Sequence, residues 1–170
     1  EVSCRCGNIG CLEAVAGGAA LARNAMIAIE KNESSFLAER FKRNKILTGK
    51  DVIDGARSGD VWSVEAVTGA GRQVGQVLAT LINFYNPSLV IIGGGVSSAG
   101  DLLLASIRET VYRRSLPLAT RDLEIRLGDL DDRAGLRGAA EMVLSELFSA
   151  NILKQWVEFG KPQIPLAYNH

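Results

Sequence analysis

The chain has 170 residues, of which 47% are hydrophobic, so it is large and apolar enough to form one domain or one lobe of a larger domain. Lys plus Arg and Asp plus Glu number 19 each, and this zero net charge leaves no basic surface typical of nucleic-acid binding, so we expect any DNA-binding element to lie outside these residues. No apolar run reaches the length of a membrane span, and the opening Glu-Val-Ser-Cys has neither an initiator Met nor a secretory signal, so we expect a cytoplasmic protein and a piece of a longer one.

All cysteines of the chain lie in its opening phrase, CRCGNIGCLE, at Cys4, Cys6 and Cys11. A disulfide between Cys4 and Cys6 would be strained, whereas Gly7 and Gly10 let a short loop bring three thiolates to one ion. Zn²⁺ prefers thiolates and takes four ligands in a structural site. We therefore predict a zinc loop over residues 1–13 whose fourth ligand is water, a carboxylate or an upstream residue. The alternative is three inert thiols in a terminal loop.

Small and apolar residues at helical spacing predict a helix over residues 13–31. Glu13 opens this helix, two residues after Cys11. It is either an acid in the first turn, favoured by the helix dipole, or a carboxylate beside the metal loop that accepts hydrogen bonds from a polyol.

The middle of the chain indicates helices. The charged stretch 32–44 predicts a short one, and Thr48 with Asp51 has the form of a capping box that opens a helix to about Ser58. An apolar stripe at spacings of three and four predicts a long helix over residues 61–85. Glycine is costly inside a helix, so we expect close packing at three positions: Gly69, Gly71 and Gly75.

The phrase NPSLVIIGGG predicts a strand and a turn. Pro87 ends the preceding helix, and the apolar run 89–92 is typical of a buried parallel strand. A helix over residues 99–114 completes half of an α/β unit. Bare glycine backbone at the carboxyl end of such a strand can approach a phosphate, so the glycines form either a nucleotide-binding loop or a tight turn without a ligand. These glycines are Gly93, Gly94 and Gly95.

The last part of the chain predicts a second strand from Leu123, a helix over residues 134–148 and a short amphipathic helix from Ala150, followed by a tail. We divide the chain into a lobe, residues 1–148, and a C-terminal helix with its tail, residues 149–170.

The phrases CRCGNIGCLEA, NPSLVIIGGGVSSAGDLLL and AGLRGAAEMVL together resemble the ROK family, named for repressors, open reading frames and sugar kinases. The resemblance implies an α/β fold, an actin-like, ribonuclease-H-like ATPase-domain lobe with a parallel-strand core flanked by helices. It implies that the cysteines hold a structural zinc, completed by a histidine some dozen residues earlier. It also implies that Glu13 binds sugar hydroxyls and that Gly93 to Gly95 lie beside ATP in kinase members.

Two parts of a family kinase are missing from this sequence: the Asp-x-Gly-x-Thr phosphate loop and the Asn-Asp pair with the general base. Phosphoryl transfer needs both together with Mg²⁺, so we expect no catalytic residue and no kinase activity in this chain, and ATP and Mg²⁺ only if the longer protein is a kinase. The stretches VYRRSLPLATRDLEIRLGDL and FSANILKQWVEFGKP resemble regulator members more than sugar kinases.

We therefore expect the sugar-sensing and dimerisation portion of a ROK transcriptional regulator. It would form a homodimer or higher homo-oligomer, bind DNA through another domain and contact no membrane. The alternatives are the C-terminal lobe of a glucokinase-like, ATP-dependent sugar kinase and a zinc-stabilised interaction lobe without a ligand.

Overall fold

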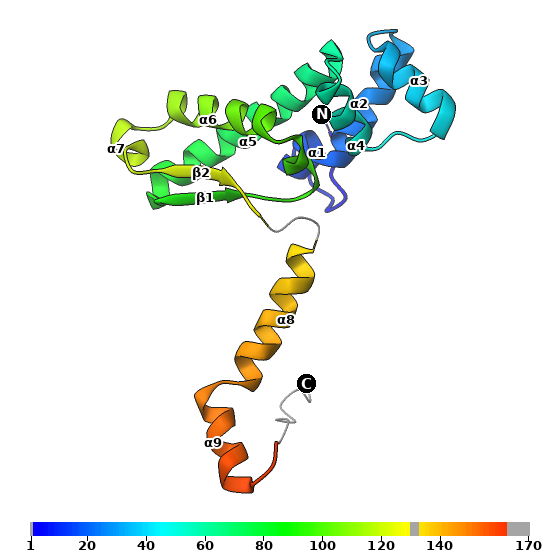
Figure 1. Cartoon of the computed structure of the whole chain (residues 1–170). Helices are drawn as coiled ribbons and strands as arrows, with labels where there is room; N and C mark the ends of the chain where they lie inside the picture. Colours follow the sequence, from blue (N-terminus) through cyan, green and yellow to red (C-terminus); the bar gives the residue numbers. More distant parts are fainter. Residues whose placement is uncertain (1, 130–132, 163–170) are drawn as a thin grey trace. The chain divides into compact units, whose positions relative to one another are not determined.

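The computed structural model describes residues 2–129 and 133–162 (Figure 1). The chain divides into two compact units, Glu1–Asp131 and Asp132–His170. The first unit contains α1 (Leu12–Ala16), α2 (Gly18–Glu30), α3 (Ser35–Asn44), α4 (Gly49–Arg57), α5 (Val61–Tyr85), β1 (Leu89–Ile92), the 3-10 helix η1 (Gly95–Ala99), α6 (Asp101–Arg114), α7 (Pro117–Thr120) and β2 (Glu124–Leu127). The second contains α8 (Ala134–Leu147) and α9 (Ala150–Phe159). Within the described ranges, no helix combines the length and the apolar character that a membrane span needs.

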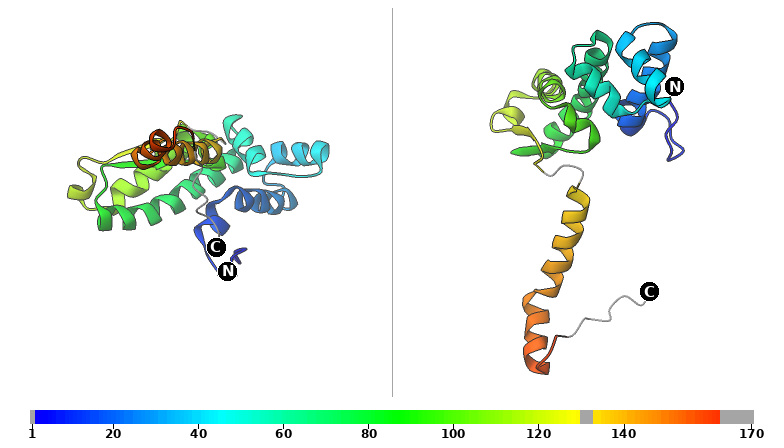
Figure 2. Two further views of the ribbon diagram at one scale, coloured as in Figure 1. Left: turned by 90° about the horizontal axis from the view of Figure 1, so that it is seen from below. Right: turned by 45° about the vertical axis from the view of Figure 1, so that its right-hand side comes forward.

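The two strands pair in parallel, with Leu89 opposite Glu124 and Ile92 opposite Leu127, as the sequence predicts. Helices α5 and α6 run side by side on one face of this small sheet, and α6 packs on β2 (Figures 1 and 2). Side chains on that face are buried or half-buried, whereas Leu89 and Ile91 on the opposite face are 39% and 56% exposed. The prediction that β1 is buried on both faces is therefore wrong for the described residues, because only one face of the sheet is covered.

The core of the first unit lies where α5 meets α6 and the sheet. Its largest fully buried side chains from these elements are Val67, Ile82, Ile107, Val111 and Ile125. Two of the three glycines predicted to allow close packing do so: an ideal Cβ on Gly71 would lie 2.7 Å from the Cβ of Ser106. Gly69 is different, because its nearest neighbour would be the mobile end of the Arg72 side chain at 3.7 Å.

The helix predicted over residues 13–31 is two helices, because the chain breaks at Gly17. This residue is extended, with a ψ of 168°, and a Cβ there would lie 2.5 Å from the carbonyl oxygen of Glu13. The guanidinium of Arg23 in α2 donates to the carbonyl oxygen of Ala14, 3.0 Å away, and so pairs one of the acceptors that the short helix α1 leaves free.

Two further differences follow the glycine turn. The helix predicted over residues 99–114 is α6, which begins at Asp101 because Ala99 belongs to η1. A short helix, α7, was not predicted; it begins with Pro117, whose fixed φ suits the first turn of a helix.

The predicted capping box at the start of α4 is confirmed. One carboxylate oxygen of Asp51 accepts from the backbone N–H of Thr48 at 2.8 Å and from the hydroxyl of the same residue at 2.7 Å. The other oxygen lies 3.3 Å from Nε of Arg40 in α3, so the cap also ties α4 to its neighbour.

In the second unit, α8 and α9 occupy the predicted segments. The rings of Phe148 and Trp156 meet edge to face with centroids 6.0 Å apart. Ile152 is the buried hydrophobic side chain of this unit among residues 133–162. The division of the chain at residue 148 stays a prediction.

Candidate functional site

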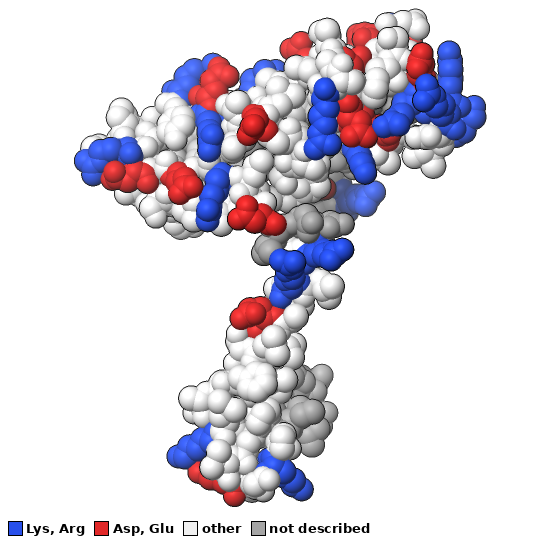
Figure 3. Space-filling model, in the orientation of Figure 1, with Lys and Arg blue, Asp and Glu red and all other residues white. Residues whose placement is uncertain are grey.

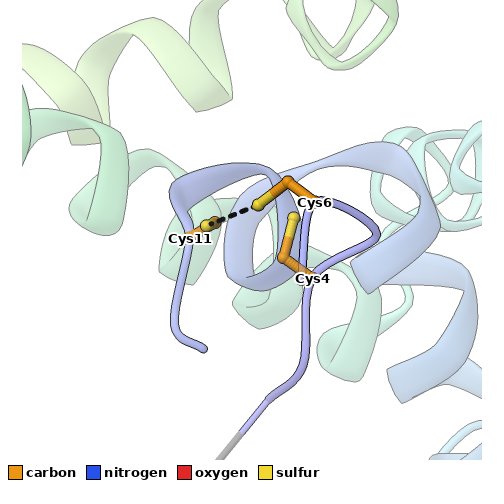
Figure 4. Close-up of side chains that lie close together, drawn as sticks. All are labelled: Cys4, Cys6 and Cys11. Atoms are coloured by element: carbon orange, nitrogen blue, oxygen red, sulfur yellow. Dashed lines mark hydrogen bonds between the residues drawn. The ribbon is translucent and has the colours of Figure 1, made fainter. Parts of the chain in front are cut away.

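The cysteine loop is a tight hairpin whose turn brings Cys4 and Cys6 onto one side (Figure 4). The backbone N–H of Gly7 donates to the carbonyl oxygen of Cys4 at 3.0 Å, and that of Cys4 donates to Asn8 at 2.8 Å. Gly7 has a φ of +90°, which favours glycine there. The hairpin then leads to Cys11, whose carbonyl oxygen accepts from the N–H of Ala14 in α1 at 2.9 Å.

The three sulfur atoms converge, as the spacing predicts. The Sγ atoms of Cys6 and Cys11 are 3.5 Å apart, and all three sulfurs lie within 4.8 Å of one another. Thiolates at about 2.3 Å from a tetrahedral Zn²⁺ lie about 3.8 Å from each other, so these residues fit three corners of a zinc site. Among the His, Cys, Asp and Glu residues of the described ranges, no fourth joins this group. The only histidine, His170, lies outside the described residues.

Proximity also changes the acidity of the thiols. The backbone N–H of Asn8, followed by the thiols of Cys4 and Cys11, lowers the pKa of Cys6 to about 7. Interaction with the thiol of Cys6, and to a lesser extent with that of Cys4, raises the pKa of Cys11 to about 11. Even without an ion, Cys6 is therefore about half thiolate at neutral pH. Thiolate is also the form that a metal ion binds.

Glu13 lies in the first turn of α1, directly after the cysteine loop. Its side chain is exposed, and among the described residues no hydrogen bond or ion pair occupies its carboxylate. The break at Gly17 leaves this carboxylate on a short helix that is fixed at one end by Cys11 and at the other by Arg23. The sequence correctly predicted that Glu13 lies at the start of a helix. It predicted one helix over residues 13–31, however, and not the short helix α1.

The triple glycine follows β1 directly. Gly94 has a φ of +92°, and an ideal Cβ on any of Gly93, Gly94 or Gly95 would meet nothing within 4 Å. Bare backbone therefore borders open space here, as a close approach to a ligand requires. The hydroxyls of Ser97 and Ser98 donate back to Gly94 and Gly95 carbonyl oxygens at 2.7 Å each, which fixes the turn into η1.

Glu13 and the triple glycine line one open pocket of about 430 Å³ in the first unit. One wall comes from α1 and the break at Gly17 and Gly18, and the other from the end of β1 and η1. The floor is apolar: Val74, Leu103 and Ile107. Two residue groups that lie 80 positions apart in the sequence thus meet at a single site that is mostly apolar, with the polar side chains of Glu13 and Ser97 in its lining, a common composition for a small-molecule site.

Sequence reasoning missed most of this lining. Val74 belongs to the apolar stripe that predicted the helix over residues 61–85, and Leu103 and Ile107 belong to the helix predicted over residues 99–114; neither prediction pointed to a ligand site. Val96 and Ser97, on the wall beside the glycines, belong to η1, which was not predicted. The one signal present was the strand followed by glycines, which marks the carboxyl end of a parallel strand.

Charges on the surface are mixed. On the face drawn in Figure 3, acidic and basic side chains alternate over most of the first unit, and basic side chains gather only at the α3 end. The formal net charge is zero. On this face the distribution is not that of a broad basic DNA-binding surface.

The family model described as "ROK family" matches residues 1–146, and the chain belongs to this family. Its fold is accordingly the actin-like fold of ROK sugar kinases and repressors, here as helices with a small parallel sheet.

Relatives of two kinds match. The chain is 36% identical over 140 residues to a glucokinase of Halalkalibacterium halodurans, covering 82% of this chain and 42% of the relative. It is 28% identical over 150 residues to the DNA-binding transcriptional repressor Mlc of Escherichia coli, covering 88% and 36%. A crystal structure of a ROK family glucokinase from Streptomyces griseus with glucose and AMPPNP superposes with a TM-score of 0.67 at 34% identity, covering 81% and 45%. The chain therefore spans less than half the length of these relatives.

Proposed function

We propose that this chain is the sugar-sensing and dimerisation portion of a ROK-family transcriptional regulator, with a structural zinc that supports the sugar site. One observation carries the sugar-binding part: the free carboxylate of Glu13 lines the same pocket as Gly93 to Gly95, on a short helix that begins at the cysteine loop. A carboxylate accepts hydrogen bonds from neighbouring hydroxyls, and the apolar floor suits the C–H face of a sugar ring.

Zinc in this proposal is bound by Cys4, Cys6 and Cys11 and acts structurally. When bound, the ion cross-links the hairpin to the start of α1. The protein's own contribution is to hold the Glu13 carboxylate at a fixed angle on the short helix α1. Without the ion, the exposed hairpin keeps its backbone hydrogen bonds and the weak contact between the sulfurs of Cys6 and Cys11.

The regulator is preferred to a kinase because the match with a repressor covers more of this chain. The match with the repressor Mlc covers 150 residues, and the match with the bacterial glucokinase covers 140. The predicted C-terminal helix is present as α9, beyond the residues that the family model matches. DNA binding would belong to a domain outside these residues, and the protein would act in the cytoplasm.

The sugar kinase is a second candidate. It is favoured by the higher identity to the glucokinase and by the open glycine backbone, which would lie beside ATP. ATP and Mg²⁺ are cofactors only under this alternative, and the general base would then come from outside the chain.

Dimerisation is part of the proposal. The end of α5 has no charged residue between Gln73 and Tyr85, and it exposes apolar side chains at helical spacing: Val77, Leu81 and Phe84. Such a charge-poor face with an aromatic residue has the composition of an interface core. Sedimentation of a Phe84→Glu variant tests it, and an unchanged dimer would exclude this face.

The test of sugar binding is calorimetric titration of the full-length gene product with hexoses and N-acetylhexosamines. Glu13→Gln is expected to weaken binding of the preferred sugar by about tenfold, because a hydrogen bond to a charged group is lost. Glu30→Gln, an exposed acid at the end of α2 outside the pocket, is the matched control and is expected to bind normally. Binding of no sugar would favour the interaction lobe. Conversion of ATP and the sugar to ADP and a sugar phosphate would favour the kinase over the regulator.

A further inference from the structure

The glycine loop depends on a neighbour for its position. Three consecutive glycines lose much conformational entropy when they are ordered, and the serine hydroxyls stabilise the loop only within itself. Something outside the loop must therefore fix it relative to the opposite wall of the pocket, where Glu13 lies.

Helices α4 and α6 both pack against η1, and α4 adds a specific hydrogen bond. Arg57, in its last turn, donates a hydrogen bond through its guanidinium to the carbonyl oxygen of Ser98 in η1. Ser98 is two residues beyond Val96 and adjoins Ser97, and both of these line the pocket. A guanidinium bonded to a backbone carbonyl is a charge-assisted bond, stronger than a neutral one.

The guanidinium of Arg57 is itself aimed by other side chains. Its Nη1 atom lies 3.7 Å from a carboxylate oxygen of Asp54, one turn earlier in α4. The other oxygen of Asp54 accepts from Arg40 of α3 at 3.0 Å. Because Arg40 of α3 fixes the Asp54 carboxylate, the guanidinium of Arg57 has a preferred orientation although its side chain is 58% exposed.

The other end of α4 contacts the opposite wall. An ideal Cβ on Gly49 would lie 2.8 Å from the Cα of Gly18, which lines the pocket at the start of α2. One rigid helix of nine residues therefore contacts both walls, through bare backbone at its start and through Arg57 at its end.

We propose that Arg57 is a positioning residue that holds the glycine loop at a fixed distance from the Glu13 wall, with α4 as the spacer. The effect on a bound sugar or nucleotide rests on the function proposed above. The effect on the loop does not, because Arg57 and Ser98 are in contact without any ligand.

Hydrogen exchange of the full-length gene product tests the loop directly. The N–H groups of Ser97 and Gly100 are bonded within η1 at 3.0 Å each, so their exchange reports local opening. Arg57→Met is expected to accelerate their exchange about fivefold, as loss of one hydrogen bond implies, and to leave the amides of α5 unchanged. Arg57→Lys, which keeps a donor and the charge, is expected to restore most of the protection.

The matched control is Arg113→Met. Arg113 forms an exposed pair with Glu109 at 3.7 Å in α6, the same separation as the Arg57 pair, and has no contact with the loop. Asp54→Asn serves if Arg57→Met fails to fold: it leaves the arginine but removes its orienting carboxylate, and about twofold faster exchange is expected. The proposal is overturned if the Ser97 and Gly100 amides of Arg57→Met exchange at the wild-type rate. It is also overturned if the amides of α5 are accelerated by the same factor.

The ligand arm uses glucose, N-acetylglucosamine and AMPPNP as probes. For any probe that the wild type binds, Arg57→Met is expected to weaken binding about three- to fivefold and Arg113→Met to leave it unchanged. Equal binding by Arg57→Met and the wild type overturns the link between loop and ligand. If the wild type binds none of these probes and no other hexose or N-acetylhexosamine, the proposed function fails, while the exchange rates still decide the role of Arg57.

Discussion

Gly75 of α5 and Thr110 of α6 are in such close contact that an ideal Cβ on the glycine would lie 2.7 Å from the Cβ of the threonine. The threonine is 1% exposed and donates its hydroxyl to the carbonyl oxygen of Ser106 at 2.9 Å, so it has little freedom to move. The close approach of α5 to α6, which places Val74 and Ile107 on the pocket floor, thus depends on the absence of a side chain at Gly75.

Gly75→Ala is expected to lower the free energy of unfolding by about 2 kcal/mol, because the added methyl overpacks a rigid contact. Gly69→Ala, on the same helix, is expected to raise it by up to about 1 kcal/mol, because its Cβ would make only an ordinary contact with the end of the Arg72 side chain, and alanine favours helix. Equilibrium denaturation in urea measures each value. Equal effects of the two substitutions would contradict the close packing of α5 on α6 at Gly75.

Local chemistry made several elements predictable from the sequence. The capping box at Thr48 and the strand over Leu89–Ile92 depend on residues within a few positions, so the pattern identified them. The break at Gly17 could not be predicted in the same way. A glycine among alanines is tolerated in a helix, and its extended backbone here depends on the packing of α1 and α2 against other parts of the chain.

The candidate site, too, could be predicted only in part from local sequence. The residue types at Cys4, Glu13 and Gly93 indicated their chemistry, but their relative positions depend on how α1 packs against α5. That packing is long-range and leaves no periodic signal in the sequence. The role of Arg57 was equally hidden, since an arginine in the last turn of a helix is explained well enough by the helix dipole.

Thr48→Ala tests the capping box. The substitution removes the hydroxyl that bonds Asp51 and is expected to cost about 1 kcal/mol of unfolding free energy, as N-cap losses do. Thr80→Ala, at an exposed position inside α5 with a long 3.5 Å bond to Gln76, is the control and is expected to change stability by less than about 0.5 kcal/mol. If both threonine substitutions lower the free energy of unfolding by a similar amount, the capping box does not contribute to stability.

Cys6→Ser tests the metal site. Loss of one of three thiolates is expected to abolish stoichiometric zinc, measured by elemental analysis after dialysis, because a hydroxyl is a poor ligand for Zn²⁺. Arg5→Gln changes the same turn without touching a sulfur and is expected to retain the ion. Because zinc supports the Glu13 carboxylate in our proposal, Cys6→Ser should also weaken sugar binding by the full-length gene product. Zinc loss with unchanged sugar affinity would separate the loop from the sugar site.

The thiol acidities predict how the metal-free loop reacts. With its pKa lowered to about 7, Cys6 is about half thiolate at neutral pH, so its alkylation by iodoacetamide is expected to rise through pH 7 and level off above pH 8. Below pH 6 the thiol is protonated and the rate is expected to fall about tenfold for each further pH unit. Cys11, with its pKa raised to about 11, is expected to react far more slowly at pH 8.

Tandem mass spectrometry of the peptide that contains Cys6 and Cys11 resolves the two sites. Added Zn²⁺ is expected to protect Cys6 at pH 8, because the metal-bound thiolate is no longer the free nucleophile. Mg²⁺, which prefers oxygen ligands, is the control ion and should leave the rate unchanged. Equal alkylation of Cys6 and Cys11 across this pH range would show that the backbone N–H of Asn8 does not stabilise the Cys6 thiolate.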